Sequence, residues 1–292
     1  MFEKIKSEVL NFGLKFISID EKIVRIFLET RPSNVNEIVI LPAVKNVMKS
    51  LISKLKNKSV HGRVYNGYLN GVKVSIIRSL VGSPNAAIAV ESLKRCTTKI
   101  IIRVDLCGGI SNDKTNISIG DILIPKMSYC GDGTSPQYIL KFLKELDHLK
   151  FINNPDSKAL NLKIGNEKIF ISEPDQGLNN IILNEANIRG LNRVNHVDFW
   201  TTDALFCETE EFIASIKSIG VQGIDMENSV LFLLSKFYDI KSASILSVSD
   251  LPCHPKYDLF NSNILHPDME TGMKRAIDLL VNSLPKIKSN LI

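Results

Sequence analysis

Short apolar runs alternate with amphipathic segments along most of the chain. We predict strands at 37–41, a short β-branched run, and at the apolar runs 99–110 and 120–129. Between them, apolar residues at helical spacing predict helices at 43–55 and 85–96. The run at 99–110 is apolar almost throughout, which is typical of a strand that is covered on both faces.

The same alternation continues through the second half of the chain. Helices are predicted near 178–188 and in "ETEEFIASIKSIG", and a strand, a helix and a second strand fill residues 223–250. A last helix is predicted at 268–284, whereas 131–180 is a looser region rich in Asn, Asp, Lys and Gly. A hairpin is predicted in "RVYNGYLNGVKVSIIRSL", because Asn-Gly suits a tight turn between two strands.

These elements predict an α/β fold: a single domain with a central mixed β-sheet flanked by helices, spanning residues 37–292. Residues 1–36, which hold one or two short helical segments before the break "RPSNVN", are predicted to form an N-terminal helical extension. We find no internal repeat, low-complexity tract or linker that would divide the chain further.

Composition narrows the class of protein. Of 292 residues, 44% are hydrophobic and 23% are charged, and the net charge of +5 is spread along the chain, so no nucleic-acid partner is expected. The five cysteines form no CxxC pair, which argues against a disulfide framework and against a metal site. The apolar runs are too short to cross a membrane, and the start lacks a signal peptide, so we expect a cytoplasmic protein.

Polar residues stand where several apolar strands end, and ligands of such sheets bind beyond strand ends. Arg103, inside "IIIRVDL", needs an anionic partner, which is either an acid of the protein or a ligand. Asp225 and Glu227 could be helix caps, and Asp250 could be a turn acid before a proline. Trp200, the one tryptophan, is more often a core residue than a stacking platform.

Four blocks of the chain carry a resemblance to a known family. They are "GSPNAAIAVESL" (82–93), "IIRVDLCGGISNDKTNISIGDILIP" (101–125), "TTDALFCETEEF" (201–212) and "GIDMENSVLFLLSKF…ILSVSD" (223–250). In this order they resemble the nucleoside phosphorylase superfamily of the purine nucleoside, uridine and methylthioadenosine phosphorylase type. The resemblance covers roughly residues 37–285, and the combination of "DMEN" with "SVSD" is its most specific part.

The resemblance implies cleavage of the N-glycosidic bond of a purine-type nucleoside. Asp250 would donate a proton or hydrogen bond to N7 of the departing purine, and its pairing with Ser249 favours purines over uridine. Met226 and Glu227 would line the ribose. The other implied positions are Asp225, Trp200 and Gly108 at the substrate, with Arg103 and Gly82 at phosphate. No cofactor is implied beyond phosphate as co-substrate, and a homo-oligomer, a dimer or a trimer of dimers, is expected by analogy.

The expected phosphate-binding half of the site departs from the family pattern. Pro42 and Asn46 stand where relatives place a glycine and an arginine, and Asp105-Leu106 replaces Gly-Ser or Gly-Thr. Lys45 could substitute only in part. Three hypotheses follow: phosphorolysis, which the retained Arg103 favours; hydrolysis, with Asp105 or another acid as base; and a non-catalytic protein that binds a nucleoside.

Overall fold

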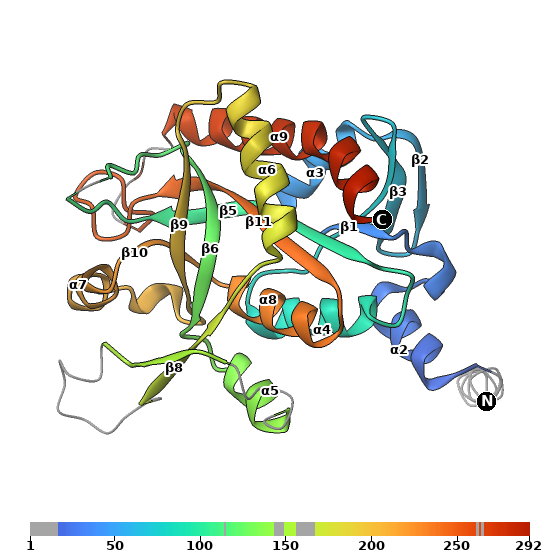
Figure 1. Cartoon of the computed structure of the whole chain (residues 1–292), viewed down its shortest axis with the longest axis horizontal. Coiled ribbons are helices and arrows are strands. Elements are labelled where there is room, and N and C mark those ends of the chain that lie inside the picture. The colour runs from blue at the N-terminus through green and yellow to red at the C-terminus, as the bar shows by residue number, and fades with distance from the viewer. Residues whose placement is uncertain (1–16, 114, 143–148, 156–166, 261–262, 264–265) are drawn as a thin grey trace.

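A mixed sheet runs through the centre of the protein, and helices cover both of its faces (Figure 1). This computed structural model describes residues 17–113, 115–142, 149–155, 167–260, 263 and 266–292. The observed sheet has the strand order β2-β3-β4-β1-β5-β10-β9-β6-β8-β7, and β11 pairs with both β5 and β6. The predicted α/β fold with one central mixed sheet is therefore confirmed.

Five strands of the sheet close into a ring. Parallel pairs join β11 to β5 and β9 to both β6 and β10, while antiparallel pairs join β10 to β5 and β11 to β6. The strands of the ring are β5 (Ile100–Gly109), β6 (Ile122–Cys130), β9 (Val194–Thr201), β10 (Val221–Asp225) and β11 (Lys241–Asp250). Because β5 and β11 are both apolar and buried, the ring forms the centre of the molecule.

Four further strands extend the sheet from β5, while β8 and β7 extend it from β6. β1 (Ile38–Ile40) pairs in parallel with β5 and with β4 (Val72–Ile77), and β4 forms the predicted hairpin with β3 (Val64–Leu69). Asn70 and Gly71 make the turn with φ values of 46° and 76°, the left-handed conformation that a tight hairpin turn requires. β2 (Lys56–His61) pairs with β3 and was not predicted, because all six of its residues are exposed.

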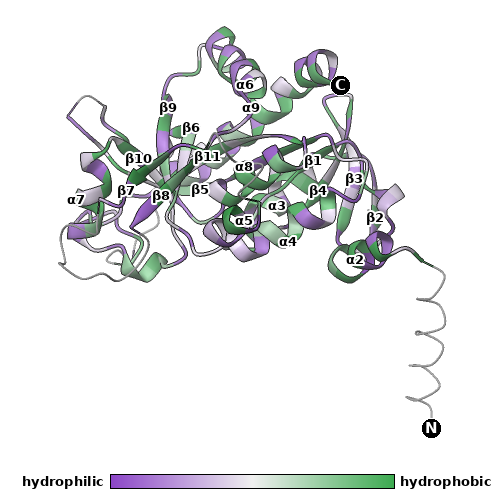
Figure 2. Cartoon of the chain, turned by 60° about the horizontal axis from the view of Figure 1, so that its bottom comes forward, coloured by the Kyte–Doolittle hydropathy of each residue, from purple (hydrophilic) through white to green (hydrophobic). Residues whose placement is uncertain are grey.

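Side chains of β1 and β5 alternate between two helical layers. Ile100, Ile102 and Val104 pack in one apolar cluster with α3 (Lys45–Ser53), α6 (Gln176–Ile188) and α9 (Pro267–Leu291). Ile101 packs in the other with α2 (Ile19–Leu28), α4 (Ser83–Leu93) and α8 (Asn228–Phe237). α8 is buried from its first residue to Ser235 and is largely hydrophobic along its length (Figure 2). By the same alternation, Arg103 and Asp105 lie on the α4 and α8 face.

The described part of the predicted N-terminal extension packs on the domain. Val24 and Leu28 of α2 are buried in the same cluster as α4, and a short 3-10 helix (Pro32–Asn34) leads from α2 toward β1. Residues 1–16 lie outside the described residues.

Three further elements lie in the region that the sequence left unassigned. They are α5 (Ser135–Lys141), β7 (Phe151–Asn153) and β8 (Lys168–Ser172). β9 also went unpredicted, since its first three side chains are only half-buried. α9 runs past Pro285, beyond its predicted end. Proline removes an N–H that the carbonyl of Val281 would accept, and Asn70 Nδ2 donates to that carbonyl instead, at 3.3 Å.

Gly272 of α9 makes a close approach that gives our first prediction. A Cβ built on Gly272 would lie 2.5 Å from Gly120 Cα and 2.4 Å from Ser247 Oγ. Alanine usually stabilises a helix relative to glycine, but here the backbone contact should reverse the sign. We expect Gly272→Ala to lower the free energy of unfolding by about 1–3 kcal/mol, measured by urea denaturation. The control is Gly177→Ala in α6, whose Cβ would meet Asp175 Oδ1 at 3.2 Å, and equal losses would contradict the packing described.

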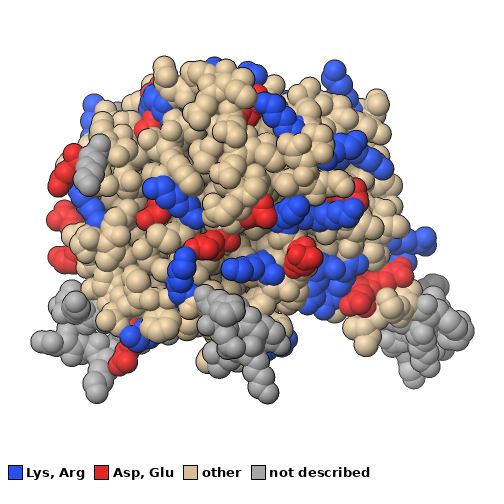
Figure 3. Space-filling model, viewed as in Figure 1, with Lys and Arg blue, Asp and Glu red and all other residues tan. Residues whose placement is uncertain are grey.

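The surface carries charges of both signs. On the face seen in Figure 3, Lys and Arg side chains lie beside Asp and Glu side chains, which agrees with a diffuse positive charge. Among the described residues, no helix combines the length and hydrophobicity that a membrane crossing would require.

Candidate functional site

Arg103 is the centre of a buried ionic cluster. Its side chain is 3% exposed, and its Nη1 donates to Asp225 Oδ2 at 2.5 Å and to Asn228 Oδ1 at 3.0 Å. Nη2 donates to Glu227, and Nε lies 3.6 Å from Asp105 Oδ2. We call Arg103, Asp105, Asp225 and Glu227 the Arg103 cluster. The anionic partner that the sequence required is thus supplied by three acids of the protein itself.

Each acid of the cluster also binds the start of one helix. Asp225 Oδ2 accepts the amide of Asn228, the first residue of α8, at 2.9 Å. The N-cap position itself is occupied by Glu227, whose side chain caps no amide of α8, so the capping alternative considered from the sequence is wrong for Glu227. Glu227 Oε1 accepts the amide of Gly82 at 2.7 Å, at the start of α4. Asp105 Oδ2 accepts the amide of Ala43 at 2.6 Å, just before α3. Three helix starts and one guanidinium therefore stabilise the three carboxylates.

Burial dominates the protonation of these acids. It raises the pKa of Glu227 to about 7, with further increases from Asp225 and Asp105 and an opposing decrease from Arg103. It also raises the pKa of Asp105, although Arg103 and the backbone amides oppose the shift. The carboxyl groups share a single guanidinium, so the raised pKa values make Glu227 and Asp105 hold protons more readily than free acids do.

The loop after β1 contributes backbone and no charged side chain to the cluster. Ala43 and Val44 donate their amides to Asp105, at 2.6 and 3.3 Å. Lys45 and Asn46 are exposed. Leu106 lies on the opposite face of β5, packed against the cluster that contains α3, α6 and α9. The residues of this loop that differ from the family pattern therefore bring no positive side chain to the cluster. The loop instead binds Asp105, which lies beside Arg103.

Asp250 ends β11 directly beside β5. It pairs with Gly108 in the sheet, and Ser249 Oγ lies 2.7 Å from its Oδ1. Burial raises the pKa of Asp250 to about 6; the hydrogen bond from Ser249 lowers it, and the nearby Asp258 raises it. A carboxyl group with this pKa is partly protonated near neutral pH, which suits a proton donor.

A glycine is required at position 108 because the chain after Asp250 packs closely against it. A Cβ on Gly108 would lie 2.7 Å from Ile224 Cγ2 and 2.9 Å from Pro252 Cγ. Gly108 thus has a packing reason that is independent of any ligand. Gly82, with φ at 101°, contacts Glu227, and Met226 beside it is half-buried and accepts a hydrogen bond from Ser83 at 2.9 Å.

Trp200 lies apart from the Arg103 cluster. Its neighbour Thr201 donates to Asp225 Oδ1 at 2.8 Å, so Trp200 projects to the other face of β9. The indole is 3% exposed and packs between Tyr129 and Phe212, with ring centroids at 6.0 and 5.9 Å. This placement corresponds to the core alternative considered for Trp200, and it leaves little of the ring available to a base.

Sequence reasoning missed two groups near Asp250. Phe206, 84% exposed, and Phe260, 48% exposed, are in contact, with ring centroids 4.7 Å apart and ring planes tilted by 37°. Glu208 follows Phe206, and burial raises its pKa to about 8, with further increases from Asp250 and Asp258. Cys253 Sγ donates to the Glu208 carbonyl at 3.1 Å, which joins this segment to the chain after Asp250. The sequence signal that could have identified this segment is an aromatic residue, Phe206, two positions before an acid, Glu208, in the polar stretch "TTDALFCETEE".

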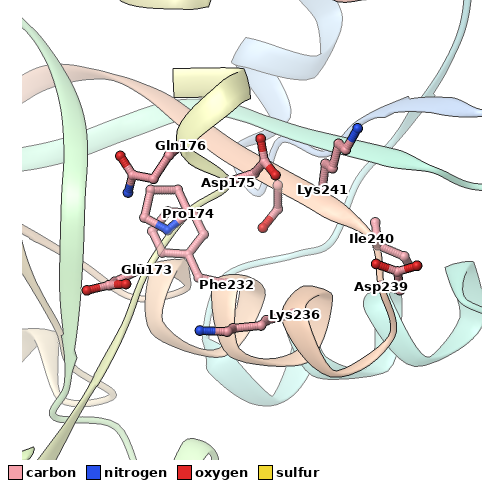
Figure 4. Close-up of a pocket in the computed structure, with 10 residues that line it drawn as sticks. Glu173, Pro174, Asp175, Gln176, Phe232, Lys236, Asp239, Ile240 and Lys241 are labelled. Atoms are coloured by element: carbon pink, nitrogen blue, oxygen red, sulfur yellow. The ribbon is translucent and has the colours of Figure 1, made fainter. Parts of the chain in front are cut away.

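A separate surface pocket lies at the other end of β11. It has a volume of about 330 Å³, and Lys241 is one of the residues that line it. Lys241 is the first residue of β11, and Asp250 is the last residue of the same strand. Figure 4 shows acids and lysines around it, among them Glu173, Asp175 and Lys236. This pocket is distinct from the Arg103 cluster. Within the described ranges, His, Cys, Asp and Glu side chains form no group of three that could hold a metal ion.

Comparisons with known proteins agree with the motifs. Residues 37–284 match the family model described as "Phosphorylase superfamily". A DeoD-type purine nucleoside phosphorylase from Buchnera aphidicola subsp. Baizongia pistaciae is 26% identical, with 82% of this chain and 85% of that protein aligned.

Two solved structures are similar in fold. One is a purine nucleoside phosphorylase from Toxoplasma gondii in complex with immucillin-H, with a TM-score of 0.67 and 17% identity, covering 90% of this chain and 95% of that one. The other is an AMP nucleosidase from Bacteroides thetaiotaomicron, with a TM-score of 0.66 and 20% identity, covering 93% and 97%.

Proposed function

The chain belongs to the phosphorylase superfamily, and from this premise we propose that it cleaves the N-glycosidic bond of a purine-type nucleoside. Asp250 carries the proposal. Its carboxyl group is half-buried at a strand end, is oriented by Ser249 and has a pKa raised to about 6. In its protonated form it would deliver a proton to N7 of the departing purine, which neutralises the charge that collects there as the bond breaks.

Glu227 and Met226 form the sugar side of the proposed site. They follow β10 directly, and Glu227 is held by Arg103 and by the amide of Gly82. A carboxylate fixed in this way can accept hydrogen bonds from ribose hydroxyls and orient the ring. Phe206 and Phe260 offer the exposed aromatic surface on which a purine could stack, in place of Trp200.

We propose water as the nucleophile. All charged partners of Arg103 among the described residues are carboxylates of the protein, so its guanidinium has no free charge to offer phosphate. In the hydrolytic step, the oxygen of water bonds to the anomeric carbon as the carbon–nitrogen bond breaks. The bonding pair leaves with the purine, Asp250 gives it a proton, and a buried carboxylate takes the proton of water. The products are the free purine and the free sugar.

Phosphorolysis is the second candidate function. It is favoured by the retained Arg103 and by the similarity to the Buchnera purine nucleoside phosphorylase. It would use phosphate as co-substrate and yield sugar 1-phosphate, with no other cofactor. A homo-oligomer, a dimer or a trimer of dimers, stays a prediction for either reaction, and sedimentation of the purified protein would test it.

The second prediction identifies the product. Purified protein is incubated with inosine, adenosine, guanosine and methylthioadenosine, with and without phosphate, and the sugar is analysed by mass spectrometry. We expect purine release with free sugar, at rates that do not depend on phosphate. Sugar 1-phosphate formed only with phosphate would establish the second candidate. Nucleoside binding without turnover would instead identify a non-catalytic binding protein.

A further inference from the structure

The side chain of Asp105 occupies an anion-binding site between β5 and the start of α3. We call this site the cradle; it is formed by the amides of Ala43 and Val44 and by Arg103 Nε. Asp105 Oδ2 accepts the amide of Ala43 at 2.6 Å, and Oδ1 accepts the amide of Val44 at 3.3 Å. These two amides lead into α3, a helix of nine residues whose first residue is Lys45. Free N–H groups at a helix start form a favourable environment for a negative charge.

Arg103 completes the cradle from the strand side. Its Nε is buried and donates no hydrogen bond to any described residue, and it lies 3.6 Å from Asp105 Oδ2. Nη1 and Nη2 are already occupied by Asp225 and Glu227. One N–H of a fully buried guanidinium and two backbone amides thus surround the carboxylate of Asp105.

We propose that the Asp105 carboxylate is an internal substitute for inorganic phosphate, which excludes free phosphate from the cradle and thereby leaves water as the nucleophile. This inference rests on the proposed function, because it names the residue that sets the choice of nucleophile in the same site. It makes Asp105 a specificity-determining residue of the reaction.

Electrostatics explains the exclusion. A phosphate anion that entered beside Asp105 would meet a negative charge at a position that is 1% exposed, where the bulk solvent screens charges weakly. The cradle offers few donors, and the carboxylate of Asp105 already uses both amides. Asp225 and Glu227 add two more carboxylates around the same guanidinium. Phosphate would therefore have to displace an internal anion that is covalently held at high effective concentration.

The same carboxylate can serve the water that replaces phosphate. As water attacks the anomeric carbon, its proton passes to Asp105, and the pair of electrons from the broken bond leaves with the purine. Burial raises the pKa of Asp105, which favours uptake of that proton. The negative charge of Asp105 before the transfer also stabilises the cationic sugar of the transition state.

The third prediction concerns phosphate binding by Asp105 variants. Inorganic phosphate is added to wild type, Asp105→Ala and Asp105→Asn, and binding is followed by calorimetry and by the shift in Tm. Asp105→Ala, which empties the cradle, should bind phosphate about tenfold or more tightly than wild type. Asp105→Asn keeps the cradle filled and should gain little. Both variants should lose about 100-fold in purine release with water.

The controls separate this inference from the proposed function. Potassium chloride at equal ionic strength removes general salt effects. Asp105→Ser is a second opening variant should the alanine variant fail to fold. Saturable phosphate binding by wild type, or a folded Asp105→Ala or Asp105→Ser protein that binds no more phosphate than wild type, would overturn the inference. Because phosphate binding is read without nucleoside, these results decide the inference even if no nucleoside is cleaved.

Discussion

Replacing Asp250 with asparagine is expected to lower purine release by about 10²–10⁴-fold while the protein stays folded. Asparagine has nearly the same shape and can accept the hydrogen bond from Ser249 Oγ, which lies 2.7 Å from Asp250 Oδ1. Its amide can donate a hydrogen bond to N7 but cannot transfer a proton. The fall should therefore appear in kcat, measured by release of purine from inosine at saturating substrate.

The pH profile gives a sharper readout of the same group. Since the pKa of Asp250 is raised to about 6, its protonated form is lost as the pH rises through that value. In wild type, kcat should fall by about tenfold for each pH unit above this pKa, and in Asp250→Asn this limb should be absent. The free energy of unfolding should change with pH in the same direction as kcat. Because the pKa of Asp250 is raised in the folded state, its protonated form stabilises the fold at low pH, and this contribution is lost as the pH rises through about 6.

Asp132→Asn is the matched control, because Asp132 is an acid that follows the end of the apolar strand β6 and is buried more deeply than Asp250. Its oxygens accept from Ser229 Oγ at 2.6 Å and from the amide of Ser135 at 2.7 Å, so it has a local structural role. We expect Asp132→Asn to keep the rate and the pH limb of wild type. Unchanged purine release by Asp250→Asn would show that Asp250 is not the proton donor.

Much of the fold could be predicted because its strands carry a strong pattern. The apolar run 99–110 corresponds to β5, and Asn70-Gly71 sets the turn between β3 and β4. β2 and β9 escaped prediction for a physical reason: β2 is an exposed edge strand, and the first half of β9 is half-buried. Their place in the sheet depends on neighbours that are distant in sequence, and local periodicity does not report on those neighbours.

The sequence predicts that Arg103 has acidic partners, but it does not predict which acids they are. An arginine inside an apolar strand requires acids, and the structure supplies Asp225 and Glu227, which are 122 and 124 residues away. That meeting depends on the antiparallel pairing of β10 with β5, which closes the ring. The position of Trp200 depends on the register of β9 beside β10, because one step along β9 separates Trp200 from Thr201, which contacts Asp225.

In the sequence, Arg103 is the main feature that favours phosphorolysis. Its environment in the structure weakens this argument. A buried arginine that faces a ligand phosphate should have an uncompensated charge, whereas Arg103 is surrounded by three carboxylates of the protein. Each carboxylate also binds the start of α3, α4 or α8. The guanidinium therefore has a structural task, the joining of three helix starts to β5, that does not depend on phosphate.

That task predicts a large loss of stability on replacing Arg103 with methionine. The variant would leave Asp105, Asp225 and Glu227 buried without their common counter-charge, which costs about 3–5 kcal/mol for a broken buried pair. The loss should grow with pH. Arg103 lowers the pKa of Glu227, so without it the value rises above about 7, and ionising the folded state becomes more costly as the pH increases. Urea denaturation at pH 5 and pH 8 measures both effects.

Arg25→Met provides the comparison for this last effect. Arg25 Nη2 lies 2.6 Å from Glu21 Oε1 within α2, and the two side chains are 39% and 29% exposed. Solvent screens such a pair, so the variant should lose only about 0–1 kcal/mol. Adding Asp105→Asn to Arg103→Met should recover part of the stability, because one of the three uncompensated carboxylates is then neutral. Equal losses for the two arginines, with no dependence on pH, would mean that burial of the Arg103 cluster does not govern its energetics.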